Sequence, residues 1–207
     1  MQIQNRDLRV FSELSRWRFL TSKQVRQLCG FKGQRSCDRR LAKLIEANYI
    51  TRKHYIYGIP RIYAVTPKAF RTFSLAFFTP HIRTEQIPHD IATINTAIYL
   101  ICHEGIDSAS ITTERELKHK AGFSNPKHMP DFIYEKDGKT YCVEVELTEK
   151  AKATLEKNIK VNYMAYDVVR YFAPAKSKVA ENVRRIGQKY GVEIVPIEGV
   201  MEYVRNI

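Results

Sequence analysis

Residues 129–148 read MPDFIYEKDGKTYCVEVELT. Two runs rich in aromatic and β-branched residues flank Asp137-Gly138, a dipeptide that favours a type I′ turn because both central residues of that turn have positive φ. A two-residue turn fixes the register of a hairpin, and in this register Asp131 lies opposite Glu144. The other cross-strand pairs are Tyr134 with Tyr141 and Lys136 with Lys139. The stretch therefore predicts a β-hairpin that pairs two carboxylates.

A third carboxylate belongs to the same patch, because Glu146 lies on the same face as Glu144, two residues along the strand. Like charges directly opposite each other destabilise a sheet. A hard divalent cation with oxygen ligands would offset this repulsion, and we expect Mg²⁺ or Mn²⁺ bound by Asp131 and Glu144. In an alternative interpretation Asp131 only begins a strand, the glutamates are solvated, and the opposite face of the hairpin is buried.

The excess of positive charge lies entirely in the first third of the chain. The 207 residues carry a net charge of +12. Residues 1–75 hold 16 Lys and Arg against 4 Asp and Glu, whereas residues 76–207 hold 18 of each kind. A basic block of domain size indicates a polyanionic partner, most commonly nucleic acid.

Composition argues against several other classes of protein. No apolar run approaches the ~20 residues that span a membrane, and the N-terminus is too polar for a signal peptide. The four cysteines, Cys29, Cys37, Cys102 and Cys142, lack the CxxC spacing of zinc sites. We therefore expect a cytoplasmic protein with reduced thiols and no membrane partner.

The basic block has the element order of a winged helix-turn-helix domain, which we assign to residues 1–78. Thr21 or Ser22 can cap the second helix, and Pro67 suits the first turn of the fourth. The predicted elements are a helix over 5–19 with Leu8, Phe11 and Leu14 at helical spacing and Val10 as a further candidate, a short helix ending near Gly30, a helix over 35–47, two strands within 49–65, and a fourth helix that Thr66-Pro67 opens.

The third helix of this domain would enter the major groove of double-stranded DNA, and the strands would touch the backbone. The predicted contacts from the helix are Gln34, Arg35, Ser36, Arg39, Arg40 and Lys43. Those from the strands are Arg52, Lys53 and Arg61. The alternative is a solvated helix face on a winged helix that binds protein.

After a linker over 76–88, residues 88–207 alternate helices and strands around the hairpin. The predicted elements are a helix that opens at His89 and ends near Gly105, a strand over 109–113, a loop over 118–130, the hairpin, a helix over 149–164 with Leu155, Ile159 and Tyr163 on one side, a strand over 168–172, a helix over 176–190, a strand over 192–195 and a helix over 199–205. This order predicts an α/β (α+β) sandwich of the restriction-endonuclease type.

Pro130-Asp131, the hairpin, Glu144-Val145-Glu146 and the following helix resemble the PD-(D/E)XK nuclease superfamily. The resemblance implies that Asp131 and Glu144 hold Mg²⁺, and that Glu114 is the acidic residue ahead of the aspartate. The position of the motif's lysine is occupied by Glu146, which has no positive charge. A lysine of the following helix, Lys150, Lys157 or Lys160, could take its part.

Most of the chain also resembles the replication-relaxation family of plasmid and mobile-element proteins. The resemblance rests on RFLT at 18–21, RRLAKL at 39–44, PHD at 88–90, TEREL at 113–117 and EVELT at 144–148. It implies a role in replication, relaxation or mobilisation of a plasmid or integrative element.

Two functions follow from these expectations. In the first, the winged helix binds DNA and Asp131, Glu144, Glu146, Glu114 and Lys150 support Mg²⁺-dependent nicking or cleavage. In the second, which Glu146 favours, the nuclease-like domain is non-catalytic and serves dimerisation or binding of other mobile-element replication or transfer proteins. An RNA-binding protein is a third class.

Overall fold

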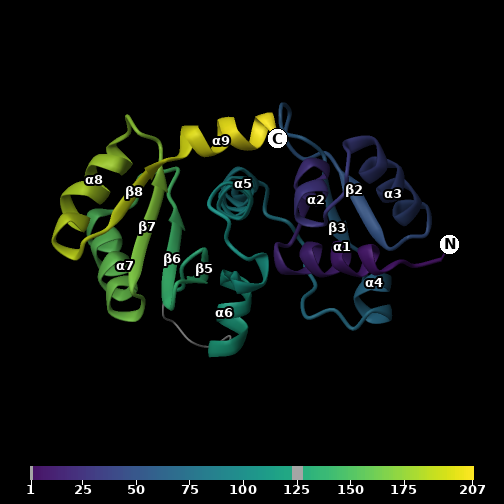
Figure 1. Cartoon of the computed structure of the whole chain (residues 1–207), viewed down its shortest axis with the longest axis horizontal. Coiled ribbons are helices and arrows are strands. Elements are labelled where there is room, and N and C mark those ends of the chain that lie inside the picture. Colours follow the sequence, from purple (N-terminus) through teal and green to yellow (C-terminus); the bar gives the residue numbers. More distant parts are fainter. Residues whose placement is uncertain (1, 123–127) are drawn as a thin grey trace. The chain divides into compact units, whose positions relative to one another are not determined.

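The computed structural model describes residues 2–122 and 128–207 (Figure 1). The chain forms two compact units, Met1–Ile94 and Asn95–Ile207. The division falls within helix α5 (Ile87–His103), which begins two residues before the predicted start at His89. Residues of the predicted linker belong to the first unit, since Ile87 packs on its buried cluster and the Ser15 hydroxyl donates a hydrogen bond to Phe77 O.

The first unit follows the predicted order of helix, short helix, helix and hairpin. Its elements are α1 (Asn5–Arg16), β1 (Leu20–Thr21), α2 (Ser22–Leu28), α3 (Gln34–Glu46), β2 (Ile50–Lys53), β3 (Ile62–Val65), α4 (Pro67–Thr72) and a 3₁₀ turn (Thr84–Gln86). The three strands form an antiparallel sheet in the order β1-β3-β2. The two-residue strand β1 was not predicted, because so short a segment has no periodicity to read.

Local signals explain where these helices begin. Thr21 caps α2 in a capping box with Gln24, and Thr66 caps α4 with Pro67 at its first turn. The prediction for α1 was wrong at one position, Leu8, which is 45% exposed, whereas Val10, Phe11 and Leu14 are completely buried. The inward face of α1 therefore runs through Asp7, Val10, Phe11 and Leu14, and Leu8 lies beside it.

A buried ion pair ties α1 to α3. Asp7 is completely buried, and its carboxylate accepts hydrogen bonds from Arg40, including one from Nε at 2.7 Å. The same carboxylate accepts the backbone N–H of Gln4 at the start of α1. Asp7 therefore holds the N-terminus of α1 and the side of α3 in one arrangement.

Asp7→Ala is expected to lower the free energy of unfolding by about 3 kcal/mol, because the change leaves the Arg40 guanidinium partly buried without its counter-ion. The measurement is urea denaturation followed by circular dichroism. Glu46→Ala is the matched control, since Glu46 is an exposed acid at the end of α3 and its loss should cost less than about 0.5 kcal/mol. Equal effects of the two changes would contradict a structural role for Asp7.

The second unit is built on a five-stranded mixed sheet in the order β4-β5-β6-β7-β8. Strands β4, β5 and β6 are antiparallel neighbours, whereas β6, β7 and β8 are parallel. The strands are β4 (Thr112–Thr113), β5 (Phe132–Lys136), β6 (Lys139–Val145), β7 (Val168–Ala173) and β8 (Glu193–Pro196). The helices are α6 (Glu114–Ala121), α7 (Lys152–Ala165), α8 (Lys178–Gly187) and α9 (Ile197–Asn206), with 3₁₀ turns at Ser108–Ser110 and Gln188–Tyr190.

Both faces of this sheet are covered. Helices α7 and α8 lie on one face (Figure 1), where they bury Cys142, Val169 and Tyr171. On the other face Arg170 of β7 donates to Glu104, directly after α5, and to the hydroxyl of Tyr134. The second half of the central strand β6, Cys142–Val145, is therefore buried, and this part of the strand includes Glu144.

Two predictions for this unit were wrong. The strand expected over 109–113 is reduced to Thr112–Thr113, and the loop expected over 118–130 begins as helix α6; residues 123–127 lie outside the described part of the chain. Helix α6 buries none of its residues, so it has no apolar stripe to reveal it. Its signal is the capping box of Thr113 and Glu116. Of the three residues expected on one side of α7, Leu155 and Ile159 are buried, whereas Tyr163 at the end of that stripe is half exposed.

Candidate functional site

The hairpin at the centre of the second unit has the predicted turn and register. Asp137 and Gly138 have φ of +50° and +73°, and Tyr134 pairs with Tyr141. The ladder ends with Phe132 opposite Val143, and Asp131 directly precedes β5, at the position that continues this register opposite Glu144. The backbone N–H of Val145 donates to Asp131 Oδ2 at 2.7 Å, which fixes the aspartate at the end of the strand.

Glu144 is buried beneath α7, with only 3% of its surface exposed. Its Oε1 accepts a hydrogen bond from Asn162 Nδ2 at 2.7 Å and lies 2.5 Å from His128 Nε2. Burial raises the pKa of Glu144; the hydrogen bond from His128 opposes this shift, and the negative charge of Asp131 adds to it. The interpretation with solvated glutamates is therefore wrong.

Glu146 is also buried, and it is paired with a lysine. Lys150 Nζ lies 2.5 Å from Glu146 Oε2. Burial raises the pKa of Glu146, with Lys150 opposing the shift. Burial lowers the pKa of Lys150, but its bond to Glu146 and the charges of Glu144 and Asp131 outweigh this and raise it. Asp131, Glu144, Glu146 and Lys150 thus form one electrostatic cluster, which we call the carboxylate cluster.

The side chains of the other predicted site residues, Glu114, Lys157 and Lys160, do not belong to the carboxylate cluster. The backbone N–H of Glu114 donates to Asp131 O at 2.8 Å, but the Glu114 side chain forms an ion pair with Lys118. Lys157 and Lys160 are exposed on α7. Among the three lysines considered for the missing position of the motif, Lys150 is therefore the one that the structure brings to the carboxylates.

Two residues of the site were missed from the sequence, His128 and Asn162. Asn162 is fully buried, and its Oδ1 has no hydrogen-bond partner among the described residues. It follows Leu155 and Ile159 on the inward stripe of α7, so a polar residue in that stripe was the available signal. His128 had no comparable signal, because it stands outside any periodic segment.

The donor set suits a hard cation only in part. The described residues contain no group of three or more His, Cys, Asp or Glu side chains placed to hold a metal ion. Mg²⁺, however, is usually held by one or two carboxylates and completes its shell with water and substrate phosphates. Asp131 and Glu144 fit that smaller requirement, as neighbouring oxygen donors whose charges act on each other.

The α3 side chains predicted to contact DNA fall into two groups, those exposed to solvent and those that donate hydrogen bonds to other side chains of the protein. Arg35, Ser36, Arg39 and Lys43 are exposed on α3, and the Ser36 hydroxyl donates to Gly33 O at the start of the helix. Gln34 donates to Ser22 and Asp38, and Arg40 is held by Asp7. Fewer of the predicted DNA-contacting side chains therefore lie on the solvent-exposed face of α3 than the sequence indicated.

The β2–β3 hairpin carries a second group of exposed cations, Arg52, Lys53 and Arg61. Arg52 contacts the hydroxyl of Tyr63. The remaining cations of α3 and the hairpin form no ion pair within the part of the chain that the structure describes: Arg35, Arg39, Lys43, Lys53 and Arg61. Their charge is therefore available to an external polyanion.

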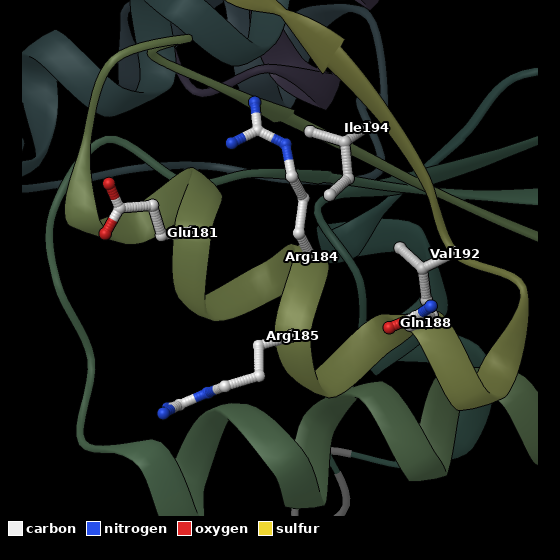
Figure 2. A pocket seen from close by; sticks show the side chains of 6 residues that line it. All are labelled: Glu181, Arg184, Arg185, Gln188, Val192 and Ile194. Atoms are coloured by element: carbon white, nitrogen blue, oxygen red, sulfur yellow. The ribbon is translucent and has the colours of Figure 1, made fainter.

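An open groove of about 670 Å³ lies between α8 and the edge strand β8 (Figure 2). Its lining residues are Glu181, Arg184, Arg185, Gln188, Val192 and Ile194. Figure 2 shows Arg184 extending toward Ile194, whereas Arg185 points away from it. No residue of the carboxylate cluster lines this groove, so it is a separate feature of the second unit.

Glu144→Gln in metal-free buffer is expected to raise the free energy of unfolding at pH 7–8 by about 1 kcal/mol, because glutamine can accept the same hydrogen bond without a buried charge. The raised pKa means that the carboxyl ionises at higher pH in the folded protein than in the unfolded chain, so the stability of the wild type falls as pH rises above about 4 and becomes constant once the folded carboxyl has ionised. Thermal unfolding of both proteins across the pH range measures the difference. It should vanish below about pH 4, where the carboxyl is protonated in both states; a difference independent of pH would contradict this origin.

Two compact units with their own sheets define a mixed α+β protein, and its second unit holds a carboxylate cluster around Glu144 of the central strand of a mixed sheet. The family model described as replication-relaxation matches residues 11–179, and the chain belongs to this family. Membership suggests a role in plasmid or mobile-element replication or relaxation. A search of curated proteins finds no match. Among the described helices, none combines the length and apolar character needed to cross a membrane.

Proposed function

We propose that this protein binds double-stranded DNA of a plasmid or integrative element in the cytoplasm, and that its second unit nicks or cleaves that DNA with Mg²⁺. The observation that carries the DNA-binding part is the set of exposed cations on α3 and the β2–β3 hairpin, which have no ion-pair partner in the described residues. Phosphate contacts by such side chains dominate affinity for DNA. The element order of the first unit supports a winged helix-turn-helix fold in which α3 enters the major groove of DNA.

The carboxylate cluster supports the proposal of nicking. Asp131 and Glu144 would hold the metal ion, which when bound supplies polarisation of the phosphate and a stabilised leaving oxygen. Asn162 orients Glu144 through the hydrogen bond to Oε1, and His128 contacts the same oxygen. These contacts hold a buried carboxylate in one rotamer, which a precise site requires.

Lys150 supplies the positive charge that the motif lacks at Glu146. Its ion pair with Glu146 holds the ammonium group within the field of Asp131 and Glu144. Lys150, four residues after Glu146 in the sequence, therefore supplies the positive charge that the motif's lysine would carry at position 146. We assign Lys150 to the stabilisation of negative charge on the phosphate, and Glu146 to the positioning of Lys150.

A supercoiled plasmid carrying the element's own origin tests both parts with the full-length protein. The expected result is duplex binding that weakens steeply as salt is raised, with Mg²⁺-dependent conversion of supercoiled to open-circular DNA. Failure to bind duplex at low salt would overturn the proposal. Binding without metal-dependent conversion would overturn the nicking part alone.

The second candidate is a non-catalytic regulator or accessory factor. The observation that favours it is that Glu146 occupies the lysine position while Glu144 is already engaged by Asn162. Such a protein would act as a homodimer on half-sites about 34–36 Å apart, or bind other replication or transfer proteins of the element. Footprinting would then give a palindromic site whose protection does not depend on metal.

A further inference from the structure

The loop that joins β2 and β3 ends in a tight turn. The backbone N–H of Ile59 donates to Ile56 O at 3.2 Å, so Tyr57 and Gly58 occupy the two central positions. Gly58 has φ of +79°, the conformation that the third residue of a type II turn requires. The turn therefore has one defined geometry, and its first central residue projects from the tip.

The rest of the loop is anchored to the first unit. Tyr55, Ile56 and Ile59 pack against a buried cluster that contains Phe19, Ile62, Ala64 and Ile87. Tyr57 is the exception, because 96% of its surface is exposed. A tyrosine side chain gains free energy from burial, yet the loop partly buries Tyr55, Ile56 and Ile59 and leaves this ring in solvent. The ring has no role in holding the fold together.

The surroundings of Tyr57 are basic. Lys53, His54 and Arg61 are exposed on the same hairpin, and Arg52 lies one residue further along. The sequence contains no Asp or Glu from residue 47 to residue 84. An exposed aromatic ring framed by cations with no acidic neighbour in sequence suits a ligand that combines negative charge with a flat apolar face.

A nucleotide has both properties, and a base stacked on an aromatic side chain contributes about 1–3 kcal/mol of binding free energy. In a matched duplex both faces of each base are covered by neighbouring bases, so the ring can reach a base face only where a strand is unpaired or opened. We propose that Tyr57 is a stacking site for an unpaired nucleobase, and that it directs the protein to DNA with exposed bases. The inference rests on the DNA-binding function proposed above and specifies its substrate.

The test compares two DNA probes bound by the full-length protein, a matched duplex and the same duplex with a short run of unpaired thymines. Wild type should bind the second probe more tightly. Tyr57→Ala should reduce its affinity about tenfold for that probe and less than twofold for the matched duplex. Tyr57→Phe should keep the preference, because stacking needs the ring and not the hydroxyl. Tyr163→Ala, which removes a half-exposed tyrosine from the other unit, should change neither affinity.

A fluorescence measurement gives an independent readout. Trp17, the single tryptophan of the chain, is buried and donates its indole N–H to Glu13. In a Tyr57→Trp variant the added indole should be quenched on binding the unpaired probe and not on binding the matched duplex, while Trp17 alone should respond to neither.

The possible outcomes distinguish failure of the stacking site from failure of the proposed DNA binding. Matched-duplex binding with no preference for the unpaired probe, or a Tyr57→Ala variant with wild-type preference, overturns the stacking site and leaves DNA binding in place. Equal loss on both probes assigns Tyr57 to general duplex contact and also overturns it. Absence of binding to either probe overturns both, and a protein-binding role for the exposed ring would replace them.

Discussion

Replacing Arg35 and Arg39 together with alanine is expected to weaken binding of the full-length protein to duplex DNA about 10- to 100-fold near physiological salt. The two side chains are four residues apart on α3, so they share one face of the helix, and both are exposed. Each phosphate contact removed should lower the slope of log affinity against log salt by about 0.9. Fluorescence anisotropy at several salt concentrations measures both quantities.

The control is a double variant with the same loss of charge elsewhere, Lys157→Ala/Lys160→Ala. Both lysines are exposed on α7 of the second unit. If only net charge governed the affinity, the two double variants would weaken binding equally, and the assignment of α3 as the recognition helix would fail. Arg40→Ala is unsuitable for this comparison, because its loss would leave the buried carboxylate of Asp7 unpaired.

The parts of the fold that could be predicted are those that local chemistry specifies. The hairpin register follows from Asp137-Gly138, and the start of α4 follows from Thr66-Pro67. Helix α6 could not be predicted from periodicity, because its exposed surface leaves no apolar stripe. Leu8 was misplaced for a related reason: an apolar residue next to the stripe of α1 looks the same in the sequence whether or not tertiary packing covers it.

The carboxylates of the site could be predicted, but their environment could not. Spacing along β6 put Glu144 and Glu146 on one face, yet their burial depends on α7 crossing that face after the strand has ended. Asn162 reaches Glu144 from 18 residues further along the chain. Such contacts come from the packing of distant elements, which turn chemistry and hydrophobic periodicity do not encode.

Glu144→Gln is expected to reduce Mg²⁺-dependent cleavage by at least about 100-fold while duplex affinity stays within about twofold of wild type. The substitution keeps the acceptor for Asn162 and nearly the same shape, but it removes the charge that would hold the cation. The measurement is the rate of nicking of supercoiled DNA at saturating protein, beside calorimetric titration of Mg²⁺ or Mn²⁺ into the protein with bound duplex. Asp131→Asn/Glu144→Gln should abolish the metal-binding signal.

This substitution separates chemistry from folding, because stability and activity should move in opposite directions. A variant that loses cleavage through misfolding would have a lower melting temperature, whereas Glu144→Gln should melt at the same temperature as wild type or higher at neutral pH. Wild-type rates of cleavage in the variant would remove Glu144 from the site. Absence of metal binding in wild type, with and without duplex, would instead favour the non-catalytic regulator.

Lys150 provides the companion comparison for the same reaction. Lys150→Met should lower the cleavage rate about 10²- to 10³-fold, the size found when one preorganised donor to a developing charge is removed. Lys150→Arg should recover part of that loss, because the positive charge beside Glu146 is retained. If Lys150→Met left the rate unchanged while Glu144→Gln abolished it, the carboxylates would support cleavage without a lysine. The ion pair with Glu146 would then be structural, and the role assigned to Lys150 would be withdrawn.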